Sequence, residues 1–281
     1  DRLASGLSQG GFRSPLTPDN LKRTMKNMII DWPAPGTARL VLSQPERRNA
    51  ITAEMWNNLP SVLTEVQTDK SLRALIVTGD GDHFAAGADI SEFETLYATT
   101  ESAAKISADI QRGFDALAAV RVPTIAMIRG ACVGGGCGLA LCCDIRIADR
   151  TAKFKIAPAS LGLVYPFGDI ARLIDAVGVA NANEVLLTGK LVKAKSAKKM
   201  GLVHAAVGVD ELETKVMDVA ARVSALSPES LAVTKSMITS YCKGQRTDTP
   251  ETDAQFAAGF SSKDFGEGFR AFLEKRKPDF R

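Results

Sequence analysis

Apolar residues follow two different spacings in the first part of the chain, and each spacing predicts its own element. Met28 to Asp31 and Ala38 to Ser43 read as two strands, and Pro33-Ala34-Pro35-Gly36 between them predicts the turn of a β-hairpin. From Thr52 to Val66 the apolar residues recur at helical spacing. Pro60 lies inside this run, which predicts a kink or a new helix start.

Strands and helices continue to alternate through the middle of the chain. Buried strands are predicted over Ala74 to Thr78, Pro123 to Ile128 and Asp144 to Ala148. Helices are predicted over about Ser102 to Val120 and again after Gly168. This alternation favours an α/β domain with helices packed around predominantly parallel strands.

The pattern changes at about residue 208, after which only helices are predicted. Apolar residues from Leu212 to Leu226 lie at helical spacing, and Ser227-Pro228 marks the start of a further helix. We therefore expect an α/β core over residues 28–207 and a helical region over residues 208–281. Residues 1–27 are rich in Gly, Ser and Pro and lack the apolar stretch of a signal peptide, so a flexible N-terminal extension is predicted.

Composition narrows the class of protein. The chain has 281 residues, of which 45% are hydrophobic and 24% charged, as in ordinary globular proteins. Its net charge of +3 is too small to favour a nucleic-acid partner, and no apolar stretch approaches the roughly 20 residues of a membrane span. Four of the five cysteines, Cys132, Cys137, Cys142 and Cys143, lie in apolar surroundings without paired metal-ligand spacing. We expect reduced core thiols, no metal site and a cytoplasmic location.

Two turns built from small residues carry the candidate chemistry. Gly134-Gly135-Gly136 leads into an apolar run that ends at Cys143, and Phe84 to Ile90 forms a second turn of small residues. Such turns expose backbone N–H groups to a ligand. One donor from each turn, converging on a single oxygen, would stabilise negative charge there as an oxyanion hole. No acidic residue or histidine lies between Gly130 and Cys143, so the turn offers donors without a base.

An ordered series of motifs resembles the enoyl-CoA hydratase/isomerase family, also called the crotonase superfamily. The series spans nearly all of the chain after Met28. Its members are Pro45-Glu46-Arg47-Arg48-Asn49-Ala50-Ile51, Phe84 to Ile90, Pro123-Thr124-Ile125-Ala126, Gly130 to Asp144, Leu186-Leu187-Thr188-Gly189, Met200-Gly201-Leu202-Val203 and Glu274-Lys275-Arg276-Lys277-Pro278.

The resemblance implies a crotonase-like ββα spiral core and a C-terminal helical region that trimerises, with hexamers formed by two trimers. It also implies a CoA thioester as ligand, with no cofactor beyond the CoA moiety. By position, the two oxyanion donors are the N–H groups of Ala86 and Gly135. The residues expected to contact CoA are Arg47, Arg48, Ala50, Ala86, Gly87, Ala88, Asp89, Ile90, Gly135, Lys275 and Lys277.

The chain departs from the family pattern at the catalytic carboxylates. Hydratases of this family use two glutamates, and the corresponding positions here are Gly138 and Pro158, neither of which can transfer a proton. Tyr165 is the first substitute, unless its ring only packs against the pocket wall. Asp169 is the second, with a helix cap or first-turn acid as its structural alternative. Weaker candidates are Glu92, Glu94, His83 and His204.

The function predicted from the sequence is that of an acyl-CoA-processing enzyme which stabilises a thioester enolate in a two-donor oxyanion hole. A CoA-thioester decarboxylase or thioesterase is the alternative among enzymes, because neither needs the glutamate pair. A catalytically silent CoA-binding or scaffold protein is the alternative from another class.

Overall fold

The computed structural model describes residues 23–25 and 27–280, and it has the α/β architecture expected from the sequence. One sheet runs in the order β1-β2-β3-β4-β5-β7-β10, and a smaller one in the order β6-β8-β9. The strands of the larger sheet are β1 (Arg23–Met25), β2 (Met28–Ala34), β3 (Thr37–Leu42), β4 (Ala74–Gly79), β5 (Thr124–Ile128), β7 (Ile145–Asp149) and β10 (Ala205–Val207).

The predicted hairpin and the predominance of parallel pairing are both confirmed. β2 and β3 pair antiparallel, whereas β3, β4, β5, β7 and β10 pair parallel in succession. β1 pairs antiparallel with β2, so the expectation of a flexible extension is wrong for Arg23–Met25. The remaining residues of that expected extension, apart from Asn27, lie outside the described residues.

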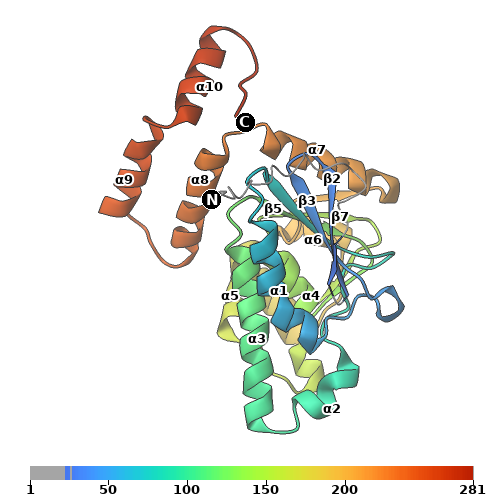
Figure 1. The fold of residues 1–281 in the computed structure, drawn as a ribbon. Coiled ribbons are helices and arrows are strands. Elements are labelled where there is room, and N and C mark those ends of the chain that lie inside the picture. Colours follow the sequence, from blue (N-terminus) through green and yellow to red (C-terminus); the bar gives the residue numbers. More distant parts are fainter. Residues whose placement is uncertain (1–22, 26, 281) are drawn as a thin grey trace, which may run out of the picture.

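The larger sheet is covered on both faces (Figure 1). Alternate residues of a strand point to opposite faces, so Leu75 and Val77 join one apolar cluster while Ala74 and Ile76 join another. The first cluster includes α1 (Ala53–Val66), α3 (Thr100–Ala118) and α4 (Gly135–Leu141). The second is closed by α7 (Leu212–Ser224), through residues such as Leu212, Val216 and Ala220.

α1 is a single helix that contains Pro60, so the predicted new start is not found. The Thr52 side chain accepts a hydrogen bond from the Met55 N–H and caps the first turn. Leu59 and Leu63, on either side of the proline, are both buried in the core cluster. This burial on one face, where α1 packs along α3, holds the helix together although Pro60 donates no backbone hydrogen bond.

The smaller sheet and its neighbours position the glycine turn. β6 (Ala131–Val133) pairs parallel with β8 (Lys153–Lys155), which pairs antiparallel with β9 (Val192–Lys193). The glycine turn connects β6 to α4. The other elements of this region are η2 (Pro45–Arg47), η3 (Ile90–Glu92), α2 (Phe93–Leu96), η4 (Pro158–Leu161), α5 (Phe167–Thr188), which is kinked at Gly178, and α6 (Ala194–Met200).

Every regular element after β10 is a helix in the part of the chain that the structure describes, as predicted. Beyond η5 (Val209–Glu211) and α7 it forms α8 (Pro228–Cys242), α9 (Pro250–Gly259) and α10 (Lys263–Leu273). These three helices extend away from the sheet (Figure 1). Lys235 on α8 ties them to the core, because its Nζ lies 2.7 Å from Asp144 Oδ2. Among the described residues, no helix has both the length and the apolar character that crossing a bilayer requires.

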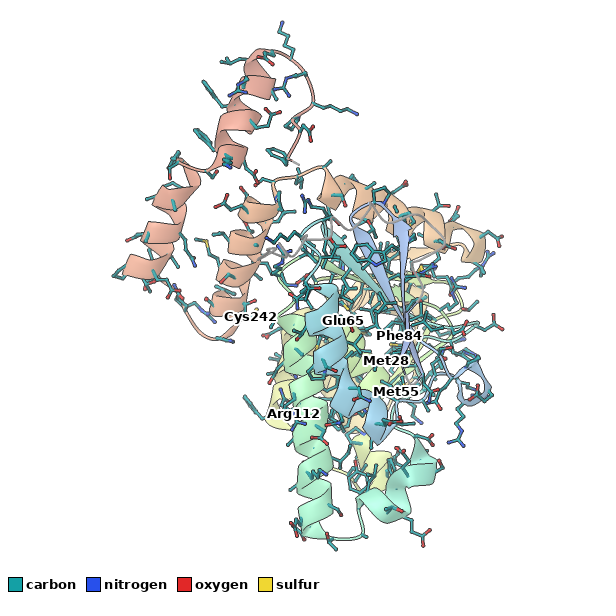
Figure 2. All side chains as sticks on the ribbon, viewed as in Figure 1. Met28, Met55, Glu65, Phe84, Arg112 and Cys242 are labelled. Atoms are coloured by element: carbon teal, nitrogen blue, oxygen red, sulfur yellow. The ribbon has the colours of Figure 1, made fainter. Side chains whose placement is uncertain are left out.

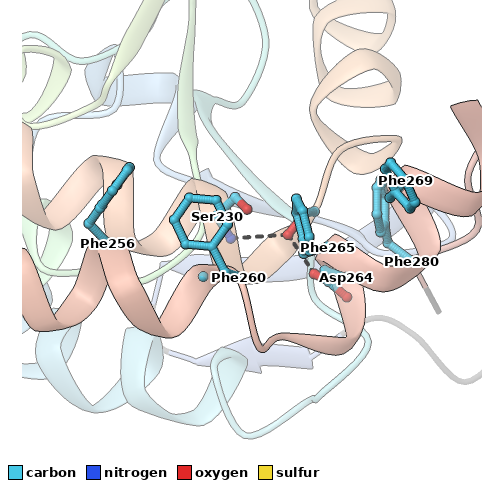
Figure 3. Close-up of a pocket in the computed structure, with 10 residues that line it drawn as sticks. Ser230, Phe256, Phe260, Asp264, Phe265, Phe269 and Phe280 are labelled. Atoms are coloured by element: carbon cyan, nitrogen blue, oxygen red, sulfur yellow. Dashed lines mark hydrogen bonds between the residues drawn. The ribbon is translucent and has the colours of Figure 1, made fainter.

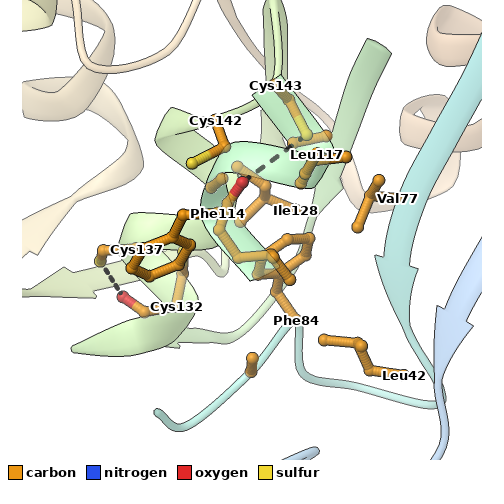
Figure 4. Close-up of a cluster of buried hydrophobic side chains, with 14 of the residues drawn as sticks. Leu42, Val77, Phe84, Phe114, Leu117, Ile128, Cys132, Cys137, Cys142 and Cys143 are labelled. Carbon is orange, nitrogen blue, oxygen red and sulfur yellow. Dashed lines mark hydrogen bonds between the residues drawn. The ribbon is translucent and has the colours of Figure 1, made fainter. Parts of the chain in front are cut away.

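The predicted burial of the four core cysteines is confirmed. Cys132, Cys137, Cys142 and Cys143 are buried and free, and the Cys137 thiol donates to the Cys132 carbonyl at 2.7 Å (Figure 4). Burial raises the pKa of Cys142 to about 12. The fifth cysteine, Cys242, is instead exposed and lies at the end of α8 (Figure 2).

Candidate active site

Backbone hydrogen bonds bring the two small-residue turns side by side. The turn at 84–90 is held on one side by bonds from the Ile51 N–H to the Gly87 carbonyl (2.7 Å) and from the Asp89 N–H to the Ile51 carbonyl (3.1 Å). On the other side, the Val133 N–H donates to the Ala85 carbonyl at 2.9 Å. These bonds place the first turn against the segment that leads into α4.

Gly87 makes this close approach possible. It has φ of +98°, which favours glycine, and a Cβ there would lie 2.9 Å from the Val133 carbonyl oxygen and 3.7 Å from the Gly135 nitrogen. A side chain at position 87 would therefore push the two turns apart. Its absence leaves the N–H groups that follow Gly87 and Gly134 on the wall of one pocket.

One of the two expected oxyanion donors is wrong. The Ala86 N–H donates to the Arg48 carbonyl at 2.9 Å, so it is already used. The N–H groups of Ala88 and Gly135 have no acceptor among the described residues, and both residues line the pocket. Gly135 is the first residue of α4, where a backbone donor has no partner within the helix. The free donors are therefore those of Ala88 and Gly135.

Asn49 anchors the segment whose Arg48 carbonyl accepts the hydrogen bond from the Ala86 N–H. Its side chain is fully buried, donates to the carbonyls of Asp80 (2.8 Å) and His83 (2.7 Å), and accepts from the Gln44 N–H (2.9 Å). Its φ of 55° is one that asparagine tolerates better than most residues. The arginine pair thus precedes an anchored turn.

The pocket next to these donors has a volume of about 430 Å³ and lies between α1, α2, α3, α4 and the segment from η4 to α5. Aromatic rings form much of its wall. Trp56 and Phe114 meet edge to face, with ring centroids 5.0 Å apart. The other aromatic residues that line the pocket are Phe93, Tyr97 and Tyr165.

Gly138 and Pro158 both line this pocket. The Phe114 ring fills the space beside Gly138, because a Cβ at that position would lie 2.5 Å from Phe114 Cζ. Among the described residues that line the pocket, Asp169 is the one carboxyl group. The Phe114 ring thus forms the pocket wall where a side chain at position 138 would begin. The pocket carboxylate, that of Asp169, comes from α5 instead.

Asp169 lies in the first turn of α5, as its structural alternative expected, and it also reaches the pocket. Its side chain is 13% exposed, and Arg172 Nη1 lies 3.0 Å from its Oδ1. Burial raises the pKa of the Asp169 carboxyl, an effect that the positive charge of Arg172 opposes. A carboxyl group with a raised pKa is suited to accept and return a proton near neutral pH.

Tyr165 also lies beside the donors. Its Oη would lie 3.4 Å from a Cβ placed on Gly134, and its ring packs against the core. Burial raises the pKa of Tyr165, so the phenol stays protonated at neutral pH. It is therefore a hydrogen-bond donor toward the pocket.

Three of the four weaker candidates have structural partners instead. Glu92 Oε2 accepts from the Ala53 N–H at 2.8 Å and caps α1, and Glu94 is exposed. His83 Nδ1 accepts from the Ala131 N–H at 3.1 Å, and His204 Nδ1 accepts from the Arg146 N–H at 3.0 Å. None of these four residues lines the pocket.

Some of the residues expected to contact CoA line the pocket or lie beside it, and others lie away from it. Gly87, Ala88 and Ile90 line the pocket, and Arg47 Nη1 lies 2.5 Å from Asp89 Oδ2 beside them. Arg48 is exposed and Ala50 is buried. The segment with Lys275 and Lys277 follows α10, at the opposite end of the molecule from α2 (Figure 1). A single chain does not bring these lysines to the pocket.

Three comparisons show what the chain is similar to. A family model described as enoyl-CoA hydratase/isomerase matches residues 34–281. A probable enoyl-CoA hydratase of Mycobacterium bovis is 36% identical over 86% of this chain and 93% of the relative. A crotonyl-CoA hydratase of Syntrophomonas wolfei is 37% identical over 86% of this chain and 94% of its own length.

Solved structures agree with this. The crystal structure of a putative enoyl-CoA hydratase/isomerase family protein from Hyphomonas neptunium superposes with a TM-score of 0.88. It is 40% identical, and the match covers 91% of this chain and 98% of the other. The fold class expected from the sequence is thereby confirmed.

Proposed function

Because the chain belongs to the enoyl-CoA hydratase/isomerase family, we propose that this enzyme binds an acyl-CoA thioester and stabilises its enolate with the N–H groups of Ala88 and Gly135. The observation that carries the proposal is the pair of unpartnered backbone donors on the wall of a pocket with one carboxyl group. Preorganised donors of this kind are each worth roughly 3–4 kcal/mol of transition-state stabilisation.

Asp169 is the proton carrier in this proposal. When the donors hold the thioester oxygen, a proton on the neighbouring carbon becomes acidic, and a carboxylate in the pocket can remove it. The same carboxyl can return the proton to another carbon of the delocalised enolate, which shifts a double bond. Tyr165 donates a hydrogen bond and stays neutral. Addition of water by two carboxylates is not available, because Gly138 and Pro158 carry none.

CoA recognition follows from the surface beside Ala88. Arg48 is exposed and can meet a phosphate, whereas the charge of Arg47 is offset by Asp89. Lys275 and Lys277 would reach a pocket only from another copy of the chain. No cofactor beyond the CoA moiety enters the proposal, and five free thiols are compatible with a reducing compartment such as the cytoplasm.

The C-terminal helices support self-association, and we include a homotrimer or a hexamer of two trimers in the proposal. No residue of α8 or α9 is buried, and Ala271 is the one buried residue of α10. An apolar hollow of about 450 Å³ lies among these helices, lined by Phe256, Phe260, Phe265, Phe269 and Phe280 (Figure 3). Exposed rings at this density are typical of surfaces that another chain covers.

Isotope exchange tests the proposed chemistry. The protein is incubated in heavy water with a panel of saturated, enoyl and malonyl-type acyl-CoA esters, and mass spectrometry follows deuterium uptake and product masses. We expect deuterium at carbon next to the thioester or along a shifted double bond. Asp169→Asn should slow exchange by about 10²–10⁴-fold with CoA binding retained.

Asp109→Asn is the matched control, because Asp109 also pairs with an arginine three residues later on a helix but does not line the pocket. Full exchange in Asp169→Asn would remove Asp169 from the mechanism. Release of CO₂ or of free CoA would instead identify a decarboxylase or a thioesterase. CoA binding without change in any ester would favour the silent binder.

A further inference from the structure

Arg172 joins the pocket carboxylate to a second carboxylate outside the pocket. It lies on α5, one turn after Asp169, and its Nη1 lies 3.0 Å from Asp169 Oδ1. Its Nη2 lies 2.9 Å from Oδ1 of Asp115 on α3, a side chain that is 62% exposed. The guanidinium carbon also lies 5.5 Å from the centroid of the Phe114 ring, on the pocket wall. The guanidinium group of Arg172 therefore pairs with both Asp169 and Asp115 and also lies over the Phe114 ring.

We propose that Arg172 is a positioning residue for Asp169, and that Asp115 sets how much of the guanidinium charge acts on the pocket carboxyl. This inference rests on the proposed function, in which Asp169 carries the proton. It adds a cross-helix device, reaching from α3 to α5, that prepares this carboxyl for proton transfer.

The geometry supports an orienting role. Arg172 holds Oδ1 of Asp169, while Oδ2 has no partner among the described residues and is the oxygen left for a substrate. Asp115 is itself held, because Gln111 Nε2 donates to its Oδ1 at 2.8 Å. A guanidinium fixed at both ends and along its face loses little further freedom when substrate binds.

The charges around Asp169 oppose one another. Burial raises its pKa, Arg172 lowers it, and Asp115 raises it. The other groups that face it are the phenol of Tyr165 and the thiol of Cys142, both with pKa values raised by burial and therefore neutral. Without Arg172 the pKa of the Asp169 carboxyl would rise further, so a smaller fraction of it would be ionised and able to act as a base. With the whole charge of Arg172 it would be a weaker base.

The test compares Arg172→Gln with Asp115→Asn, since the two changes should act in opposite directions. The pH profile of deuterium exchange into an acyl-CoA ester is measured for each variant. We expect Arg172→Gln to reduce kcat at least tenfold, with little change in KM, and to move the rising limb upward by about one pH unit. Asp115→Asn should move the same limb downward. Arg172→Lys, which keeps the charge without the fork, should recover part of the rate.

A second readout does not depend on turnover. Infrared difference spectra between the protein and its Asp169→Asn variant across pH follow the C=O stretch of the protonated carboxyl, which should titrate higher in Arg172→Gln and lower in Asp115→Asn. Arg112→Gln is the matched control, because Arg112 pairs with Asp109 on α3 at the same spacing, away from the pocket.

Unchanged titration in both variants would overturn the inference while leaving Asp169 as the proton carrier. A protein that exchanges no ester yet shows the expected spectral shifts would overturn the proposed function alone.

Discussion

Phe114 shows how a single ring shapes the site at the scale of one residue. It fills the space next to Gly138 and meets Trp56 edge to face. The guanidinium group of Arg172 lies over the same ring. Replacing Gly138 by Glu would therefore not by itself restore a hydratase carboxylate, because the new Cβ would lie only 2.5 Å from Cζ of the ring. The absence of a carboxylate at position 138 and the position of the Phe114 ring are therefore linked, because the ring fills the space that a side chain there would need.

Gly138→Ala and Gly266→Ala should change stability in opposite directions. At position 138 the added Cβ overlaps Phe114, so we expect a loss of roughly 1–3 kcal/mol in the free energy of unfolding. Gly266 is exposed within α10 with nothing within 4 Å of its Cβ position, so alanine should add about 0.5–1 kcal/mol there. Urea unfolding measures both. A stable Gly138→Ala variant would contradict the tight packing described for Phe114.

The sequence located the site turns but not the donor within the first one. Ala86 and Ala88 have the same side chain and lie in the same motif, so nothing local distinguishes their N–H groups. The Arg48 carbonyl, from a segment about forty residues earlier, occupies the first and leaves the second free. Which backbone donor is free is decided by tertiary contacts that the spacing of residues does not encode. Asp169 was found because an acid after Gly168 is visible in the sequence.

At the scale of elements, the C-terminal tail is fastened to α10 by one carboxylate. Glu267 accepts from the Arg276 side chain and, at 2.8 Å, from the Asp279 N–H. These hydrogen bonds lower the pKa of Glu267 from 4.5 to about 2. A lowered pKa in the folded state contributes stability above pH 4.5, and this contribution is lost as the pH falls toward 2.

Amide hydrogen exchange of Asp279 should report this fastening. We expect protection of the Asp279 N–H at neutral pH, its gradual loss between pH 4.5 and 2, and its loss at neutral pH in Glu267→Gln. Glu274→Gln is the control, because Glu274 accepts from Arg276 but not from Asp279. Equal protection in all three proteins would mean that the tail is held by other contacts.

Elements with long apolar patterns were predicted within a few residues, among them α3, α7 and the parallel strands. The short strands β6, β8 and β9 were not predicted, because two or three residues carry no readable period. The unbroken path of α1 through Pro60 depends on packing against α3, which lies some forty residues further along.

At the scale of the whole molecule, the exposed rings of the tail predict self-association. Light scattering should give a mass that is three or six times the 29.9 kDa of one chain. Phe260→Asp should shift it toward one chain, because a charge in the apolar hollow opposes burial. Leu187→Asp is the control, since Leu187 is 81% exposed but lies on α5, outside the hollow. A single-chain mass for the unaltered protein would contradict the prediction.

Because four cysteines are buried and one is exposed, the rates at which the thiols react can measure how fast the fold opens. A thiol reagent meets one accessible sulfur, that of Cys242, while the fold is intact, and it meets all five when the core opens. The four slow reactions therefore time the exposure of α4 and β6, the elements that carry the glycine turn. The fast reaction, at Cys242, can attach a dye to the end of α8 without disturbing the pocket. The signal of that dye then reports whether the C-terminal helices contact another chain.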